Sequence, residues 1–102
     1  MNYQIQSIHF SLNKKLKFLI NKKVNKLLSI NERINSVSVY MKIEKKSTFN
    51  NKLIEIKLNA PNLKFFAKKQ ANSFEESVDL VFRALRKQIL KIKSNWIYLF
   101  FS

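Results

Sequence analysis

Hydrophobic residues recur along the chain with two periods, one typical of strands and one typical of helices. Residues 37–43 and 54–58 alternate apolar and polar positions, which predicts two strands that each bury one face. Residues 3–7 and 64–70 carry shorter versions of this alternation. The stretch from about residue 13 to residue 28, by contrast, repeats apolar residues every three or four positions and predicts an amphipathic helix.

A second amphipathic helix is predicted from Ser73 to Lys93. It begins with a capping box, because Glu76 follows Ser73 at a spacing of three residues. Ser11 or Asn13 is expected to cap the first helix. The polar stretch 45–51 and the Ala60-Pro61-Asn62 segment read as the connections between strands.

These elements follow one another in the order β-α-β-β-β-α. Because the strands keep one polar face, we expect helices to cover only one side of the sheet. A right-handed crossover makes the first two strands parallel, and the next two then run antiparallel. The predicted fold is α+β, a four-stranded mixed sheet with two parallel helices packed on one face. We expect one domain over residues 1–95 and an apolar C-terminal tail over residues 96–102.

Both predicted helices carry an apolar stripe on one face and basic residues on the rest. The stripe of the first comprises Leu12, Leu16, Leu19, Ile20, Val24, Leu27 and Leu28, and that of the second Phe74, Val78, Val81, Phe82, Leu85, Ile89 and Ile92. The candidate nucleic-acid-binding residues are Lys15, Lys22, Lys23, Lys26, Arg83, Arg86, Lys87 and Lys91. Parallel neighbouring helices would unite these cations into one surface. Phe18 falls among the polar positions, where the pattern gives it no structural role.

The net charge of +14, from 20 Lys and Arg against 6 Asp and Glu, favours a polyanionic partner. Codon bias is an alternative source of part of this charge. Lys, Asn, Ile and Phe are all favoured by AT-rich codons and together make up 49 of the 102 residues. The segregation of the charges onto particular helix faces argues against bias alone.

Several kinds of catalytic and metal site are excluded by composition. The chain has no Cys, no Gly and one His, so a thiolate, a glycine-rich nucleotide loop and a Ser–His–Asp arrangement are not available. Capping and the helix dipole account for Glu75, Glu76 and Asp79 without a metal ion. We therefore expect a protein that is not an enzyme and has neither cofactor nor metal.

Aromatic residues divide into two groups by their place in the pattern. Phe65, Phe74 and Phe82 fall at buried spacings and are expected in the core, whereas Tyr40, Phe49 and Phe66 are candidates for exposed stacking residues.

No signal peptide is visible, and the longest apolar run, Trp96–Phe101, is far shorter than the roughly 20 residues that span a bilayer. We therefore expect a cytoplasmic protein. Three interpretations of the apolar run stay open: it folds back over the open sheet face, it binds a hydrophobic partner, or it touches a membrane.

Four stretches carry a resemblance to a known family: residues 12–16, 23–27, 72–79 and 86–91, the last reading Arg-Lys-Gln-Ile-Leu-Lys. With the element order, they make residues 3–94 similar to the short ribosome hibernation-promoting factors, which include protein Y and the sigma-54 modulation proteins. Longer relatives add a C-terminal dimerisation domain to which nothing here corresponds, so any role in pairing ribosomes is open.

The resemblance implies binding to the small ribosomal subunit, in the channel used by mRNA and by A- and P-site tRNA, and inhibition of translation on idle ribosomes. It nominates Lys23, Lys26, Lys87 and Lys91 as rRNA contacts, with Arg83 and Arg86 matching the family less well. Two alternatives remain: a permanent ribosomal protein that binds RNA structurally, and a peripheral membrane protein.

Overall fold

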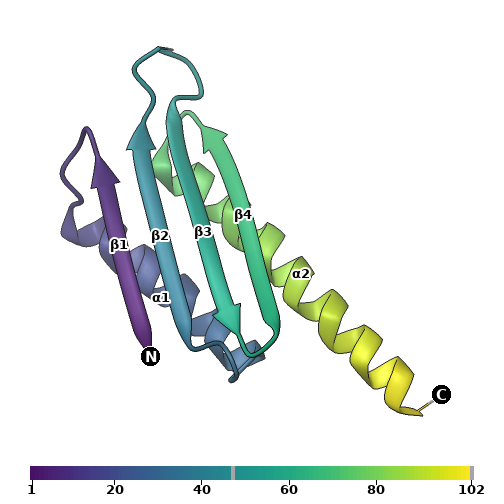
Figure 1. Ribbon diagram of the computed structural model, residues 1–102. Helices are drawn as coiled ribbons and strands as arrows, with labels where there is room; N and C mark the ends of the chain where they lie inside the picture. Colours follow the sequence, from purple (N-terminus) through teal and green to yellow (C-terminus); the bar gives the residue numbers. More distant parts are fainter. Residues whose placement is uncertain (47, 102) are drawn as a thin grey trace.

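The structure is a computed structural model that describes residues 1–46 and 48–101, with side chains described as far as Lys93. Its elements are β1 (Asn2–Ile8), α1 (Lys14–Ile30), β2 (Ser36–Ile43), β3 (Lys52–Ala60), β4 (Leu63–Ala71) and α2 (Phe74–Phe101). The strands lie in the order β1-β2-β3-β4, and both helices cover one face of the sheet (Figure 1). The predicted α+β fold is confirmed.

Strand pairing follows the predicted directions. β1 and β2 are parallel, with Tyr3 opposite Val37. β2 and β3 are antiparallel, as are β3 and β4, and Ile56 lies opposite both Val39 and Ala67. Because side chains alternate between the two faces of a strand, this register gathers the apolar residues on the face that the helices cover.

One hydrophobic core fills the space between the sheet and the helices. The strands contribute fully buried side chains such as Val37, Met41 and Ile54, and the helices contribute Ile20 and Leu85. The predicted stripes of both helices belong to this core or pack against it. Phe65, Phe74 and Phe82 are buried as predicted, while Phe49 and Phe66 are exposed and Tyr40 is half-buried.

The beginnings of the two helices are held together. Phe10, just before α1, stacks on Phe74, the first residue of α2, with ring centroids 4.5 Å apart. Asn13 caps α1, since its Oδ1 accepts a hydrogen bond from the Leu16 N–H at 2.8 Å. Ser73 caps α2, since its Oγ accepts one from the Glu76 N–H at 3.1 Å. The helices therefore start side by side and run in the same direction, as Figure 1 shows.

Asparagine and histidine take the backbone conformations that glycine often supplies. Asn62 has a φ of 62° directly after Pro61 in the turn between β3 and β4, and Asn50 has a φ of 51° in the loop before β3. His9, at the end of β1, has a φ of 70°. Asn and His tolerate this region better than most residues, which lets a chain without glycine make these turns.

The second helix is longer than predicted. The predicted helix ends at Lys93, but α2 continues to Phe101 and projects past the end of the sheet (Figure 1). No Gly or Pro follows Lys93, so no stop signal ends the helix there. The side chains of the apolar run Trp96–Phe101, and the contacts proposed for them, lie outside the described residues.

Candidate nucleic-acid interface

Four lysines of α1 point away from the sheet or towards α2. Lys15, Lys22 and Lys26 are exposed, and Lys23 is half-buried at the edge of the apolar stripe. Lys15 lies in the first turn, where the helix dipole disfavours a cation, and that turn contains no acidic residue. The charge of Lys15 is therefore not explained by helix stability, which favours a role in binding.

Four cations of α2 continue this surface. Arg83, Arg86, Lys87 and Lys91 are all exposed. We call these four and the α1 residues Lys15, Lys22, Lys23 and Lys26 together the two-helix face. The helices that carry them lie on the same side of the sheet and contact each other, so the structure brings all eight residues to one side of the molecule.

One acidic residue lies in the middle of the two-helix face. Asp79 of α2 forms an ion pair with Arg83, one turn later, at 3.0 Å, and a second with Lys23 of α1 at 3.9 Å. These contacts show which side of α2 faces α1. From the sequence, capping and the helix dipole accounted for Asp79 and its acidic neighbours. The contact with Lys23 was not predicted, because spacing within one helix cannot show what lies across from it.

The cations of α2 are distributed around the helix rather than along one line. Helical spacing places Arg83 and Arg86 on the side of Asp79, which faces α1. Lys91 follows Gln88 by three residues and shares its side, which faces β4. Lys87 lies between these two sides. The eight cations therefore form a convex surface that extends from α1 across α2 towards the β4 edge.

Gln88 fastens α2 to the outer edge of the sheet. Its Oε1 accepts a hydrogen bond from the Phe66 N–H at 3.2 Å, and its Nε2 donates one to the Phe66 carbonyl at 2.7 Å. The side-chain amide thus pairs with the open edge of β4 as a neighbouring strand would. The sequence matched Gln88 to the family stretch but gave no sign of this partner.

Replacing Gln88 with leucine is expected to lower the free energy of unfolding by about 1 kcal/mol, because the backbone groups of Phe66 lose both partners. Urea denaturation followed by circular dichroism measures the change. Replacement of exposed Lys69, on the same strand, with methionine is the control and should leave the free energy nearly unchanged. An unaltered stability in Gln88→Leu would show that the edge pairing contributes nothing.

The side of α1 that faces away from α2 is attached to β1. The Tyr3 hydroxyl donates a hydrogen bond to Asn21 Oδ1 at 2.5 Å. Burial of the ring raises the pKa of Tyr3 above its ordinary value, because the charged form is poorly solvated there. Asn21 therefore faces β1, and Lys23, on the other side of α1, faces α2.

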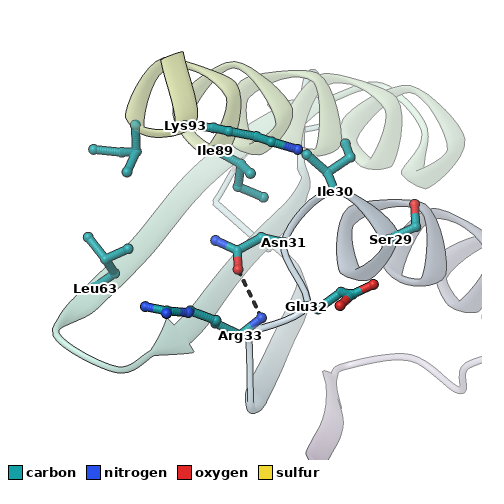
Figure 2. Close-up of a pocket in the computed structure, with 9 residues that line it drawn as sticks. Ser29, Ile30, Asn31, Glu32, Arg33, Leu63, Ile89 and Lys93 are labelled. Carbon is teal, nitrogen blue, oxygen red and sulfur yellow. Dashed lines mark hydrogen bonds between the residues drawn. The ribbon is translucent and has the colours of Figure 1, made fainter. Parts of the chain in front are cut away.

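An open pocket of about 450 Å³ lies where α1 ends beside α2. Its lining comprises Ser29, Ile30, Asn31, Glu32, Arg33, Leu63, Ile89, Ile92 and Lys93. Figure 2 shows Leu63 and Ile89 on its walls and the basic side chains of Arg33 and Lys93 at its edges. Asn31 Oδ1 accepts a hydrogen bond from the Arg33 N–H at 3.0 Å and so shapes the loop after α1.

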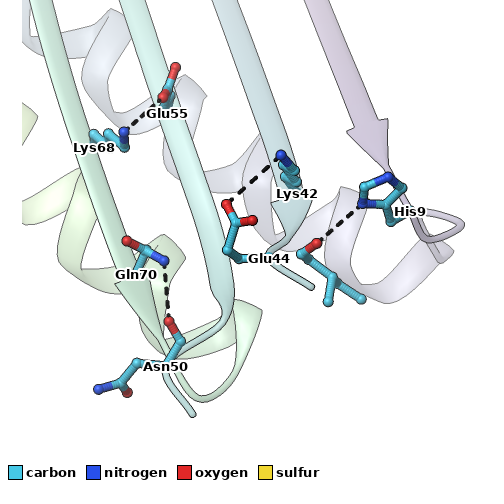
Figure 3. A network of polar contacts seen from close by, with 8 residues as sticks. His9, Lys42, Glu44, Asn50, Glu55, Lys68 and Gln70 are labelled. Atoms are coloured by element: carbon cyan, nitrogen blue, oxygen red, sulfur yellow. Dashed lines mark hydrogen bonds and ion pairs between the residues drawn. The ribbon is translucent and has the colours of Figure 1, made fainter. Parts of the chain in front are cut away.

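Polar contacts at the far end of the sheet do not assemble a reactive centre. His9 is exposed, and its Nδ1 lies 3.3 Å from the Ile43 carbonyl oxygen (Figure 3). Two ion pairs lie on the neighbouring strands and just after β2: Lys42 with Glu44 at 3.8 Å, and Lys68 with Glu55, further along the sheet, at 3.6 Å. Among the described residues, no three His, Cys, Asp or Glu side chains cluster as metal ligands do.

Comparison with known protein families shows which family this chain belongs to. A family model described as sigma 54 modulation protein / S30EA ribosomal protein matches residues 3–96. The chain belongs to this family. S30EA proteins are ribosome-associated translation regulators of the hibernation type. The resemblance read from the sequence is thereby confirmed.

Solved structures share the fold of this S30EA protein. A ribosomal subunit interface protein from Coxiella burnetii superposes with a TM-score of 0.80 at 20% identity, over 92% of this chain and 99% of that one. The N-terminal domain of Protein Y from Thermus thermophilus gives a TM-score of 0.75 at 14% identity, over 90% and 99% of the two chains. No curated protein matches the chain. Within the described part of the chain, no helix is long and apolar enough to cross a bilayer.

Proposed function

We propose that this S30EA protein is a ribosome hibernation factor. It binds the small ribosomal subunit in the mRNA channel, across the A and P sites, and inhibits translation on idle ribosomes. The observation that carries this proposal is the two-helix face, eight cations on adjacent helices of a protein from a ribosome-associated family. Residues 1–95 form the binding domain, which acts in the cytoplasm without catalysis or cofactor.

The proposed mechanism is competition for phosphates. The cations of the two-helix face contact rRNA phosphates along the path of mRNA and tRNA, so bound protein and bound tRNA exclude each other. Six of the eight cations are lysines, which contact phosphates as point charges rather than reading base edges in the bidentate manner of arginine. Recognition then depends on the shape and charge of folded rRNA.

Such binding depends strongly on salt. If the protein neutralises about six phosphates, raising the salt concentration from 50 to 200 mM should lower its affinity by roughly three orders of magnitude. The reason is that binding releases condensed counterions, and added salt opposes their release. An affinity that barely changes over this range would contradict a phosphate-dominated contact.

Sedimentation of cell extracts tests the proposed function directly. A hibernation factor is expected to migrate with idle ribosomes and to be absent from polysomes. A permanent ribosomal protein would occur in both fractions in equal proportion to rRNA. Purified protein bound to vacant small subunits should also be displaced by excess tRNA with mRNA. Retention on translating ribosomes would overturn the proposal.

Replacing Asp79 with asparagine is expected to strengthen subunit binding. The substitution removes a negative charge from the middle of the two-helix face and releases Lys23 and Arg83 from their ion pairs. We expect roughly 2- to 10-fold tighter binding at low salt, with a steeper salt dependence. Filter binding to vacant small subunits over a salt series measures both.

The matched control for Asp79→Asn is Glu44→Gln. It removes one carboxylate that pairs with a single lysine, Lys42, whose position in β2 places it on the sheet face away from the helices. This control should leave the affinity unchanged. Weaker binding by Asp79→Asn would mean that Asp79 positions Lys23 and Arg83 for their contacts, and equal effects of both variants would contradict the location of the interface.

A further inference from the structure

Phe18 is the most exposed large hydrophobic side chain among the described residues, with an exposed fraction of 71%. It lies on α1 opposite the buried stripe that includes Leu16 and Ile20. Nothing in the fold requires an aromatic ring there, because the core beneath α1 is complete without it. Single apolar residues are common on protein surfaces, so the case for a partner rests on what surrounds this ring.

The surroundings of Phe18 are strongly cationic. Lys14, Lys15 and Lys22 lie four residues before, three before and four after it, so all three neighbour it on the helix surface. All three are exposed, and no residue of α1 is acidic. Among the described residues, the aromatic rings that stack on each other are those of Phe10 and Phe74. Phe18 therefore has no stacking partner in the described part of the chain.

We propose that Phe18 stacks on an unpaired nucleobase of the RNA that the two-helix face binds. This inference rests on the proposed function. An aromatic ring among phosphate-binding lysines matches the chemistry of a single-stranded or flipped-out nucleotide, which offers a flat π-face beside an anionic phosphate. Lys15 and Lys22 then hold the adjoining phosphates while the ring holds the base.

A lipid surface fits these residues less well. Membrane-bound helices place a continuous apolar face in the interface, whereas the large aliphatic residues of α1 face the sheet and the core. Around Phe18 the exposed surface of α1 consists of lysines and Asn25. A single ring with polar neighbours is suited to one base rather than to an acyl layer.

The test compares Phe18→Ala, Phe18→Leu and Phe18→Trp in binding to vacant small subunits at several salt concentrations. Alanine and leucine should each weaken binding roughly tenfold, because neither presents a π-face, whereas tryptophan should retain the affinity. The slope of log affinity against log salt should not change in these variants. In Lys22→Ala, the matched loss of a phosphate contact, that slope should fall by about 1.

Chemical probing of the rRNA identifies the base. Wild-type protein should protect one or a few unpaired bases that become reactive again with Phe18→Ala, although the subunit remains bound at saturating protein. Circular dichroism should be unchanged in every variant, since the side chain is exposed.

Three outcomes would overturn this inference. Full affinity in Phe18→Ala would remove any role for the ring, and full affinity in Phe18→Leu would show an apolar contact with a protein instead. Phe18-dependent flotation with phosphatidylglycerol vesicles, without loss of subunit binding, would assign the ring to lipid. Each leaves the proposed function intact, which fails only if wild-type protein does not bind the subunit.

Discussion

Reversing the charges of Lys87 and Lys91 together is expected to abolish binding to the small subunit at physiological salt. Both lysines are exposed on α2 within the two-helix face. Each lost phosphate contact lowers the slope of log affinity against log salt concentration by about 1. The two glutamates in addition repel the phosphates. We therefore expect binding at least about 100-fold weaker near 100 mM salt, measured by co-sedimentation or filter binding.

The matched control places the same reversal on the opposite side of the sheet. Lys57 and Lys64 are exposed on β3 and β4, and neither points towards the helices. Lys57→Glu with Lys64→Glu changes the net charge by the same amount, so it separates a local contact from general attraction. Equal loss in both double variants, or unchanged affinity in Lys87→Glu with Lys91→Glu, would reject the assignment of the interface to α2.

Replacing Leu85 with alanine is expected to lower the free energy of unfolding by about 2–5 kcal/mol. Leu85 has an exposed fraction of 0% and lies in the centre of the α2 stripe, so truncation removes buried methyl groups and leaves a cavity. Urea denaturation measures the loss. A small domain has little stability in reserve, so a loss at the upper end of this range would leave a substantial unfolded population.

Leu80→Ala is the control on the same helix. Leu80 is exposed, so the same chemical change should cost at most about 0.5 kcal/mol. A loss in Leu85→Ala no larger than that in Leu80→Ala would contradict the burial of Leu85 and the packing of α2 on the sheet.

The period-two and helical patterns were sufficient to predict the fold, because the strands bury mainly the face that the helices cover. Strand directions then followed from the handedness of the crossover through α1. Most boundaries moved by one or two residues: β1 and β4 are each one residue longer at both ends, and α1 ends at Ile30 rather than near Leu28. The exception is α2, which continues to Phe101 instead of ending at Lys93. Helix and strand ends depend on tertiary contacts that no local pattern encodes.

What the sequence could not predict depends on residues far apart in the chain. Leu53 is buried on the sheet face away from the helices, between Lys42 and Gln70 on the neighbouring strands, although alternation places it on a polar face. The hydrogen bonds of Gln88 to β4 and the ion pair of Asp79 with Lys23 likewise join separate elements. A pattern within one element carries no information about such partners.

The cationic residues were found from the sequence because their signal is local. An amphipathic helix with an acidic start and a basic end exposes its cations wherever it packs, so Arg83, Arg86, Lys87 and Lys91 were identified from spacing. The parallel arrangement of the two helices was predicted from the topology, through the right-handed crossover rule. Whether these residues contact rRNA stays a prediction.

Site-specific cross-linking tests most directly whether the helices, rather than the open sheet face, contact rRNA. The chain contains no cysteine, so Asn25→Cys on the exposed side of α1 and Gln6→Cys on the open sheet face each accept a single benzophenone label. On vacant small subunits, we expect photocross-links to rRNA of the mRNA channel from Asn25→Cys and few from Gln6→Cys. Cross-links from Gln6→Cys with none from Asn25→Cys would contradict the account.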